Sequence, residues 1–270
     1  MRVLQLASSI RSVLGFAKVG FASYLAYPAG VAMVFLSYPV IILMYRAVFG
    51  AVYDAGAQTG YTREGWLTYV TVSWILNTFY MTPTGRNLGA NVREGQVAMD
   101  LLKPLNLQAI YFGQSLGRTM FRFVFASLPL LVAFSIFAKL HVPGVALIVP
   151  FVLSVFLGYL INFTLDYMIG LTAFFLEYNN GVRMGVRMVM NLAGGMVIPL
   201  DYLPPAVSAL FHQLPTQFMF FQPMQIFLGR RSVGDSWLSV ATSAAWLIAL
   251  LCAAQLVQRR GMRQLSISGG

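Results

Sequence analysis

Few side chains in this sequence could take part in acid–base, metal or covalent chemistry. The two histidines, His141 and His212, fall in separate segments, and neither has a ligand-like neighbour. An enzyme that acts on membrane lipids would need clustered acid–base groups or metal ligands. The sequence also has no Gly-x-x-x-x-Gly-Lys-Ser/Thr loop, the device that cradles ATP phosphates. We therefore expect no catalytic residue, no metal site and no cofactor bound by this chain.

Three polar residues stand within long apolar stretches, where they are costly and so are candidates for function. Asp166 could line a cavity or pair with an arginine such as Arg183, and we favour the pair. Asn162 and Asn191 could hydrogen-bond between helices, which is the commoner role, or contact a substrate. A secondary transporter or channel would show several carboxylates at mid-membrane or two related halves. Asp166 is solitary, so that class is the alternative and not the first choice.

The composition explains this shortage of reactive groups. Hydrophobic residues make up 58% of the chain and charged residues 10%, whereas soluble domains have about 25% charged residues. A helix of about 20 apolar residues crosses the hydrocarbon core with every backbone amide satisfied. The sequence therefore predicts an all-α integral membrane protein with one transmembrane domain over residues 1–270. The six expected spans cover residues 28–49, 65–84, 117–137, 143–165 (continuing past Asp166), 186 onward with an interruption at Gly194, Gly195 and Pro199, and 237–256.

The distribution of basic residues predicts the orientation, because lysine and arginine are retained on the cytoplasmic side. Thirteen of the 18 lie in the N-terminal segment, the C-terminal segment and the regions that follow the second and fourth spans. We expect a multi-pass protein of the bacterial plasma (inner) membrane with both termini in the cytoplasm. The net charge of +10 then indicates topology and attraction to membrane lipids. No recognisable DNA or RNA module is present, so we expect no nucleic-acid partner.

Residues 1–20 have an amphipathic pattern that differs from a cleaved signal peptide. Arginine, lysine, serine and glutamine side chains share the face opposite the apolar one. This pattern predicts a helix that lies in the membrane interface, and a plain surface anchor is the alternative. The residues of the apolar face are Val3, Leu6, Ile10, Val13, Leu14 and Ala17.

A short charged segment separates the second and third expected spans, within residues 86–112. It reads Arg93-Glu94-Gly95-Gln96-Val97-Ala98-Met99-Asp100-Leu101-Leu102-Lys103-Pro104. The pattern predicts a short amphipathic cytoplasmic helix, and an ordinary solvated loop helix is the alternative. The run resembles the coupling segment of type-2 ATP-binding cassette (ABC) exporter permeases, in which a glycine, a pair of leucines and a basic-proline end recur.

A second resemblance lies between the fifth and sixth expected spans, in the region 201–230. Charge is absent from Tyr202 to Gly229, and several prolines exclude one straight span there. We expect short re-entrant helices that dip into the outer leaflet, where irregular backbone must be covered by protein or line a cavity. The succession Gly194-Gly195, Ile198-Pro199-Leu200 and Leu214-Pro215 is similar to the external re-entrant region of type-2 ABC permeases, which roofs the translocation path.

This resemblance implies a permease subunit that exports hydrophobic or amphipathic small molecules, drug-like compounds or lipids. The partners it implies are a cytoplasmic ABC ATPase dimer, which binds ATP and Mg, and a second permease subunit. An unlike second permease is favoured over a copy of this chain. The path would run chiefly between spans one, two and five. A secondary transporter or channel not coupled to ATP, and a non-transporting anchor for an ATPase, are the alternatives.

The resemblance also assigns roles to particular residues. Val97, Leu101 and Leu102 would fill a groove of the ATPase. Glu94, Asp100 and Lys103 would make peripheral polar contacts with it. The ATPase-coupling set is Glu94, Gly95, Val97, Asp100, Leu101, Leu102, Lys103 and Pro104. The path or gate set is Asn191, Gly194, Gly195, Pro199, Pro204 and Pro215.

Overall fold

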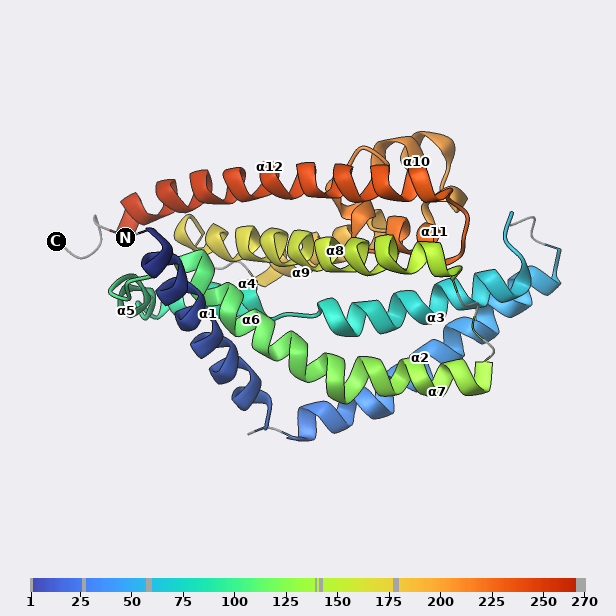
Figure 1. Ribbon diagram of the computed structural model, residues 1–270, viewed down its shortest axis with the longest axis horizontal. Helices are drawn as coiled ribbons and strands as arrows, with labels where there is room; N and C mark the ends of the chain where they lie inside the picture. The colour runs from blue at the N-terminus through green and yellow to red at the C-terminus, as the bar shows by residue number, and fades with distance from the viewer. Residues whose placement is uncertain are drawn as a thin grey trace.

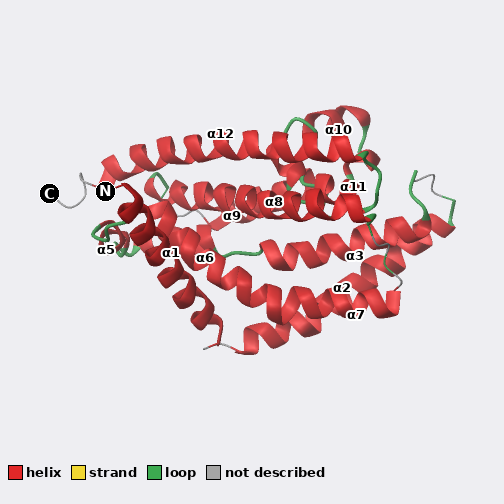
Figure 2. Ribbon diagram, in the orientation of Figure 1, coloured by secondary structure: helices red, strands yellow, loops and turns green. Residues whose placement is uncertain are grey.

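The computed structural model describes residues 2–25, 28–56, 60–138, 140, 143–176 and 180–265. Every regular element in these ranges is a helix (Figure 2). A π-helical turn (Phe123–Ser127) joins α6 to α7, and 3-10 turns lie at Thr172–Phe174, Leu200–Tyr202 and Pro215–Phe218. The α-helices are α1 (Arg2–Leu25), α2 (Pro28–Asp54), α3 (Arg63–Tyr80), α4 (Thr84–Arg93), α5 (Val97–Leu101), α6 (Leu107–Arg122), α7 (Leu128–Ala138), α8 (Val145–Leu171), α9 (Asn180–Ala193), α10 (Pro205–Phe211), α11 (Phe221–Phe227) and α12 (Val233–Leu265).

Four helical segments among the described residues are long and apolar enough to cross a membrane. They are Leu36–Asp54, Leu107–Phe137, Val145–Phe174 and Val233–Gln264, which correspond to the first, third, fourth and sixth expected spans. The chain is therefore a multi-pass helical membrane protein. The second and fifth expected spans correspond to α3 and α9. These helices have 18 and 14 residues and lie outside those four segments, so a total of six spans stays a prediction.

The ends of these helices gather at the two ends of the long axis (Figure 1). The start of α1, the end of α12 and the short helix α5 lie at one end. The turn between α2 and α3, together with α10 and α11, lies at the other end. The segment that resembles a coupling helix and the segment that resembles a gate are therefore separated by the length of the bundle.

The helix that contains the third expected span begins before Gly117. The helix begins at Leu107, where the Asn106 side chain caps it by accepting a hydrogen bond from the Gln108 amide at 3.0 Å. It then continues through the π-helical turn to Ala138. Arg118 and Arg122, which we expected at the entry of the span, therefore lie within a longer helix, and the start of the membrane-crossing part at Gly117 stays a prediction. The fifth helix also begins earlier than predicted, at Asn180 rather than Val186.

Helix α1 packs directly against α6 through glycines. A Cβ atom at Gly117 would lie 1.8 Å from the carbonyl oxygen of Ala17, and one at Gly20 would lie 2.2 Å from that of Gln114. Gly113 and Gly117 thus form the small-xxx-small spacing that allows helix backbones to approach closely in membranes. Arg122 adds a hydrogen bond of 2.7 Å to the Tyr24 hydroxyl. The N-terminal helix is therefore held by the bundle, in addition to any contact with lipid.

The predicted apolar face of α1 is used only in part for this packing. The backbone carbonyls of Val13 and Ala17 meet the glycines of α6, whereas Leu14 is exposed. The side chains of Val3, Leu6 and Ile10 lie outside the described residues.

The glycine contact predicts opposite effects of the same substitution at two positions. Gly117→Ala should lower the free energy of unfolding by about 1–3 kcal/mol, because its Cβ would overlap the α1 backbone. Gly15→Ala is the matched control: nothing lies within 4 Å of its Cβ, and alanine should raise helix stability by up to about 1 kcal/mol. Thermal unfolding in detergent measures both. Equal effects of the two substitutions would contradict the close α1–α6 contact.

Candidate functional site

The segment that resembles a coupling helix is a compact tip built from α4, a turn and α5. Helix α4 ends at Arg93, and Gly95 reverses the chain with a positive φ of 73° that favours glycine. The helix after this turn covers only Val97–Leu101, so it is shorter than the Glu94 to Lys103 helix that we expected. Glu94 and Gly95 are exposed in the turn itself.

The base of this tip is fixed inside the chain's own core. Val97 is completely buried and packs in a cluster with Leu88, Leu107, Tyr111 and Leu171. Our prediction that Val97 fills a groove of a partner is therefore wrong. Its side chain instead anchors α5 to α4, α6 and α8.

Asp100 and Lys103 also act within the chain. The Asp100 carboxylate is buried and accepts hydrogen bonds from Lys103 Nζ at 2.6 Å and from the Tyr111 hydroxyl at 3.2 Å. Lys103 Nζ in turn lies 5.4 Å from the ring centroid of Phe16 in α1. Both side chains thus have partners within the chain, and their peripheral contacts with an ATPase stay a prediction. The contacts within the chain hold the tip against α6 and α1.

Three large apolar side chains of the tip remain exposed. Leu102 is 80% exposed, Met99 66% and Leu101 40%; we call these three residues the α5 patch. Pro104 beside them is also exposed. Our sequence reasoning named both leucines but missed Met99, although its i, i+3 spacing from Leu102 places both on one helix face. An exposed apolar cluster on an internally braced support is suited to docking another protein.

Next to this tip, a polar cluster joins α4, α8 and α9. Asp166 forms an ion pair with Arg187 at 3.1 Å and accepts a hydrogen bond of 2.9 Å from the Gly85 amide. Arg187 also donates to the side chain of Asn162 at 2.7 Å. Asn162 donates to the carbonyl oxygen of Tyr80, at the end of α3, at 2.7 Å. The prediction of a structural ion pair for Asp166 is correct in kind, but Arg187 is the partner rather than Arg183.

This cluster lies where backbones approach closely. A Cβ atom at Gly85 would lie 2.5 Å from the carbonyl oxygen of Asp166, and one at Gly170 would lie 2.9 Å from Gly85 Cα. The start of α4 therefore rests directly on α8. A displacement of α4 would be transmitted through Asp166 and Arg187 to α9.

At the other end of α9 the helix is interrupted where the sequence predicted. It ends at Ala193, and Gly195 adopts a positive φ of 76°. The Tyr69 hydroxyl donates to the Gly195 carbonyl at 2.5 Å, and the Phe221 amide donates to the Gly194 carbonyl at 2.9 Å. Thr216 donates its hydroxyl to the carbonyl of Ala193 at 3.1 Å. We call these three hydrogen bonds the α9 latch, because they tie the end of α9 to α3, to the start of α11 and to the 3-10 turn before α11.

The remaining predicted gate residues are spread over this region. Asn191 is half-buried, and its side-chain oxygen has no hydrogen-bond partner among the described residues. Pro199 is buried and Pro204 is exposed at the start of α10. Pro215 begins the 3-10 turn that supplies Thr216 to the latch. The structure thus brings Gly194, Gly195 and the Pro215 turn together, whereas Pro204 lies at the surface.

A polar network that our sequence reasoning missed covers this end of the bundle. Asp201 accepts hydrogen bonds from Tyr61 and Gln225, each at 3.0 Å. The guanidinium of Arg230 lies 3.8 Å from the Tyr61 ring centroid. Burial, and then the charge of Asp201, raise the pKa of Tyr61. The sequence contained a signal for this network, because Asp201 is the only carboxylate between residues 178 and 234 and would need a polar partner.

Of the two histidines, the structure describes only His212. His212 lies beside Gln217, whose side-chain amide donates to the His212 carbonyl. His141 lies outside the described residues.

The ion pair predicts that the two arginines of α9 differ in importance. Arg187→Met should lower the free energy of unfolding by about 3–5 kcal/mol, because it leaves the buried Asp166 carboxylate without its partner. Arg183→Met, one turn earlier, removes the same charge and should cost less. Adding Asp166→Leu to Arg187→Met should recover part of the loss, as coupled residues do. Chemical unfolding in detergent measures all three, and a larger cost for Arg183→Met would overturn the assignment.

Comparison with known families identifies the chain. A family model described as ABC-2 family transporter protein matches residues 31–269, which is most of the sequence. A search of curated proteins finds no match. The match covers the helices that form the tip, the polar cluster and the latch, and the family consists of non-catalytic membrane subunits. The chain therefore belongs to the ABC-2 transporter family and is an ABC-2 type permease.

Proposed function

We propose that this permease exports hydrophobic or amphipathic small molecules, or lipids, and that a separate ABC ATPase subunit drives it. The single observation that supports this most is the α5 patch: apolar, exposed and fixed from below by Val97 and Asp100. A rigid apolar tip is what a soluble motor needs in order to transmit force. ATP and Mg would bind in that partner.

We further propose six spans, with α3 and α9 as the second and fifth. The buried face of α3, which includes Trp66 and Tyr69, supports its place inside the bundle, although it is less apolar than its neighbours. The end of the molecule with α5 would face the cytoplasm of a bacterial cell, together with both termini. The excess of lysine and arginine at this end supports that orientation.

A second permease subunit would cover α9 and complete the path. Met184 and Met188 of α9 are strongly exposed, and an open groove of about 490 Å³ runs along this helix. The walls of the groove are almost entirely apolar, and the exposed methionines beside it can adapt to varied apolar shapes, which suits an amphipathic cargo. We favour an unlike permease as the partner over a second copy. The groove is lined by Val182, Gly185, Val186, Val189, Met190, Ala193, Leu214 and Thr216.

The proposed mechanism links the two ends of the molecule. Closure of the ATPase dimer would push the α5 patch and, with it, α4. Gly85 and Asp166 would pass this displacement to Arg187 and so to α9. The far end of α9 would then pull on the α9 latch. Gly194-Gly195 would act as the hinge of the re-entrant region 201–230, which we call the roof. Release of the latch would open the path outward.

Replacing the exposed leucines should abolish binding of the motor. Leu101→Asp with Leu102→Asp puts two charges at the centre of the α5 patch, where docking would have to desolvate them. We expect the ATPase to co-purify with the wild-type chain from its native membrane in mild detergent and to be lost from this variant, as measured by mass spectrometry. A preparation of the wild-type chain with no ATPase would favour a secondary transporter or channel.

The matched control applies the same change at the opposite end. Val207→Asp with Leu210→Asp alters two exposed apolar residues of α10 and should leave the ATPase bound. Loss of the ATPase from both double variants would mean that general destabilisation, and not the α5 patch, is responsible.

The α9 latch should open when its shortest hydrogen bond is removed. Tyr69→Phe deletes the hydrogen bond to Gly195 and should raise exposure of the roof in the resting state. In a background in which Cys252, the single cysteine, is replaced by serine, Leu203→Cys introduces one labelling site in this region. The rate at which a membrane-impermeant maleimide labels this site then reports how exposed the region is. We expect several-fold faster labelling in Tyr69→Phe.

Gly194→Leu with Gly195→Leu should have the opposite effect and block ATP-dependent labelling. New Cβ atoms at these positions would lie within 2.9–3.1 Å of Met190, Phe220, Phe221 and Tyr69. Unchanged labelling and unchanged coupling of ATPase activity in the double variant would show that the hinge is elsewhere.

A further inference from the structure

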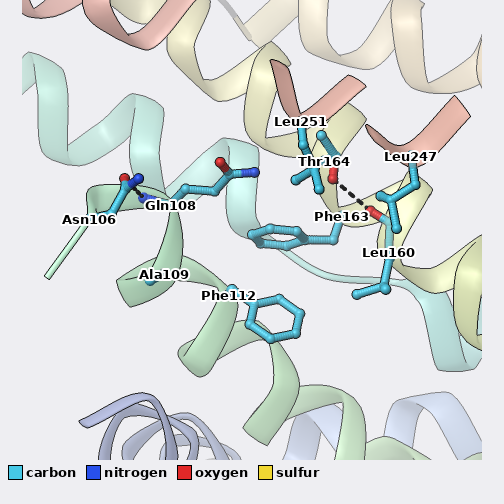
Figure 3. Close-up of a pocket in the computed structure, with 9 residues that line it drawn as sticks. All are labelled: Asn106, Gln108, Ala109, Phe112, Leu160, Phe163, Thr164, Leu247 and Leu251. Carbon is cyan, nitrogen blue, oxygen red and sulfur yellow. Dashed lines mark hydrogen bonds between the residues drawn. The ribbon is translucent and has the colours of Figure 1, made fainter. Parts of the chain in front are cut away.

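A cleft between α6, α8 and α12 has no role in the coupling and gating described above. It measures about 280 Å³ (Figure 3), and it shares no lining residue with the groove of α9. This volume is just below the roughly 300–1,000 Å³ of sites for drug-sized ligands. It is lined by Asn106, Gln108, Ala109, Phe112, Leu160, Phe163, Thr164, Leu247 and Leu251.

The lining has a polar end and an apolar end. Asn106 and Gln108 lie at one side of the cleft, whereas Phe112, Leu160 and Leu247 lie toward the other (Figure 3). Asn106 already has hydrogen-bond partners, because its side-chain oxygen accepts from the backbone amide of Gln108 and from the side chain of Gln258. The polar end coincides with the start of α6, on the side of the molecule where α5 and the end of α12 lie (Figure 1).

Gln108 is the residue that points to a ligand. Its side chain is only 8% exposed, and its Nε2 has no hydrogen-bond partner among the described residues. The amide extends from α6 across the cleft toward Thr164 and Leu251 (Figure 3). A buried unpaired donor costs free energy, so a ligand that brings an acceptor oxygen to this position would be favoured.

Helix α12 supplies a positive charge on the same ridge. Residues four apart form a ridge along a helix, so Leu247, Leu251, Gln255 and Arg259 follow one another toward the end of α12. The first two line the cleft, and the last two are exposed beyond its polar end. A ligand in the cleft would therefore meet, in order, apolar walls, an amide donor and a guanidinium.

We propose that this cleft binds one anionic glycerophospholipid from the leaflet on the α5 side. One acyl chain lies between Phe112, Leu160 and Leu247. An ester carbonyl of the glycerol accepts the hydrogen bond from Gln108 Nε2, and the phosphate lies near Arg259. This inference needs only that the chain sits in a bilayer, and it holds whether or not an ATPase or a second permease binds.

The test counts lipids that stay with the protein. The full-length chain is placed in nanodiscs of equal parts phosphatidylcholine and phosphatidylglycerol, and retained lipids are measured by native mass spectrometry after release. We expect one phosphatidylglycerol to be retained preferentially. Gln108→Leu should weaken its retention about three- to tenfold, the value of one hydrogen bond. Arg259→Ala should weaken it roughly fivefold.

Filling the cleft gives the most direct variant and a matched control. Leu251→Trp should abolish the retained lipid. Leu256→Trp makes the same change on α12, about 140° around the helix at a residue that is 60% exposed, and should retain it. Arg260→Ala is the matched control for Arg259→Ala, because Arg260 lies about 180° around the helix from Leu251, and it should retain the lipid.

Three outcomes would overturn the proposal. They are equal retention of both lipids by the wild-type chain, equal retention by all variants, and equal loss in Leu251→Trp and Leu256→Trp. Thermal unfolding of each variant separates lipid loss from misfolding. Gln108→Leu should not lower stability, because it removes an unpaired buried amide.

Discussion

The ion pair between Asp166 and Arg187 is the contact on which the rest of this structure depends. It lies where α4, α8 and α9 meet, and Asn162 extends it to the last carbonyl of α3. The Asp166 carboxylate is buried and the Arg187 guanidinium is largely removed from water, and the hydrogen bonds to the Gly85 amide and the Asn162 side chain offset part of that cost. Helices that would otherwise touch through apolar side chains alone thereby acquire one fixed register.

The two ends of the bundle use opposite strategies on either side of that contact. At the α5 end, buried groups brace a short helix from beneath and leave apolar side chains facing outward. At the α10 end, aromatic and polar groups close over the chain, and glycine conformations with hydrogen bonds to backbone carbonyls replace a continuous helix. A firm surface at one end and a segmented one at the other is consistent with force entering where the fold is rigid and motion occurring where it is jointed.

Sequence patterns predicted most reliably what depends on local backbone chemistry. The interruption of α9 at Gly194-Gly195 follows from glycine alone, and the apolar lengths located four of the helices. The sequence could not decide whether Arg183 or Arg187 pairs with Asp166, because the two arginines lie on one face of α9. Only the packing of α9 against α8 determines which of them reaches the carboxylate. Burial of Val97 likewise depends on α6, a helix that begins before the expected span, whose start we took from Arg118 and Arg122 as a membrane boundary. The proline and the capping asparagine at residues 104 and 106 were the better signal.

If the α5 patch docks an ATPase as we propose, its three exposed side chains would also affect how long the protein survives in a cell. A subunit without its motor would present these residues to water, in the way that a misfolded protein presents its core. Chaperones and proteases act on such surfaces, so an orphan permease would be removed while an assembled one is shielded. The same three side chains that would receive force in the complex would then also serve as its quality-control signal, and the cellular amount of permease would follow the supply of ATPase.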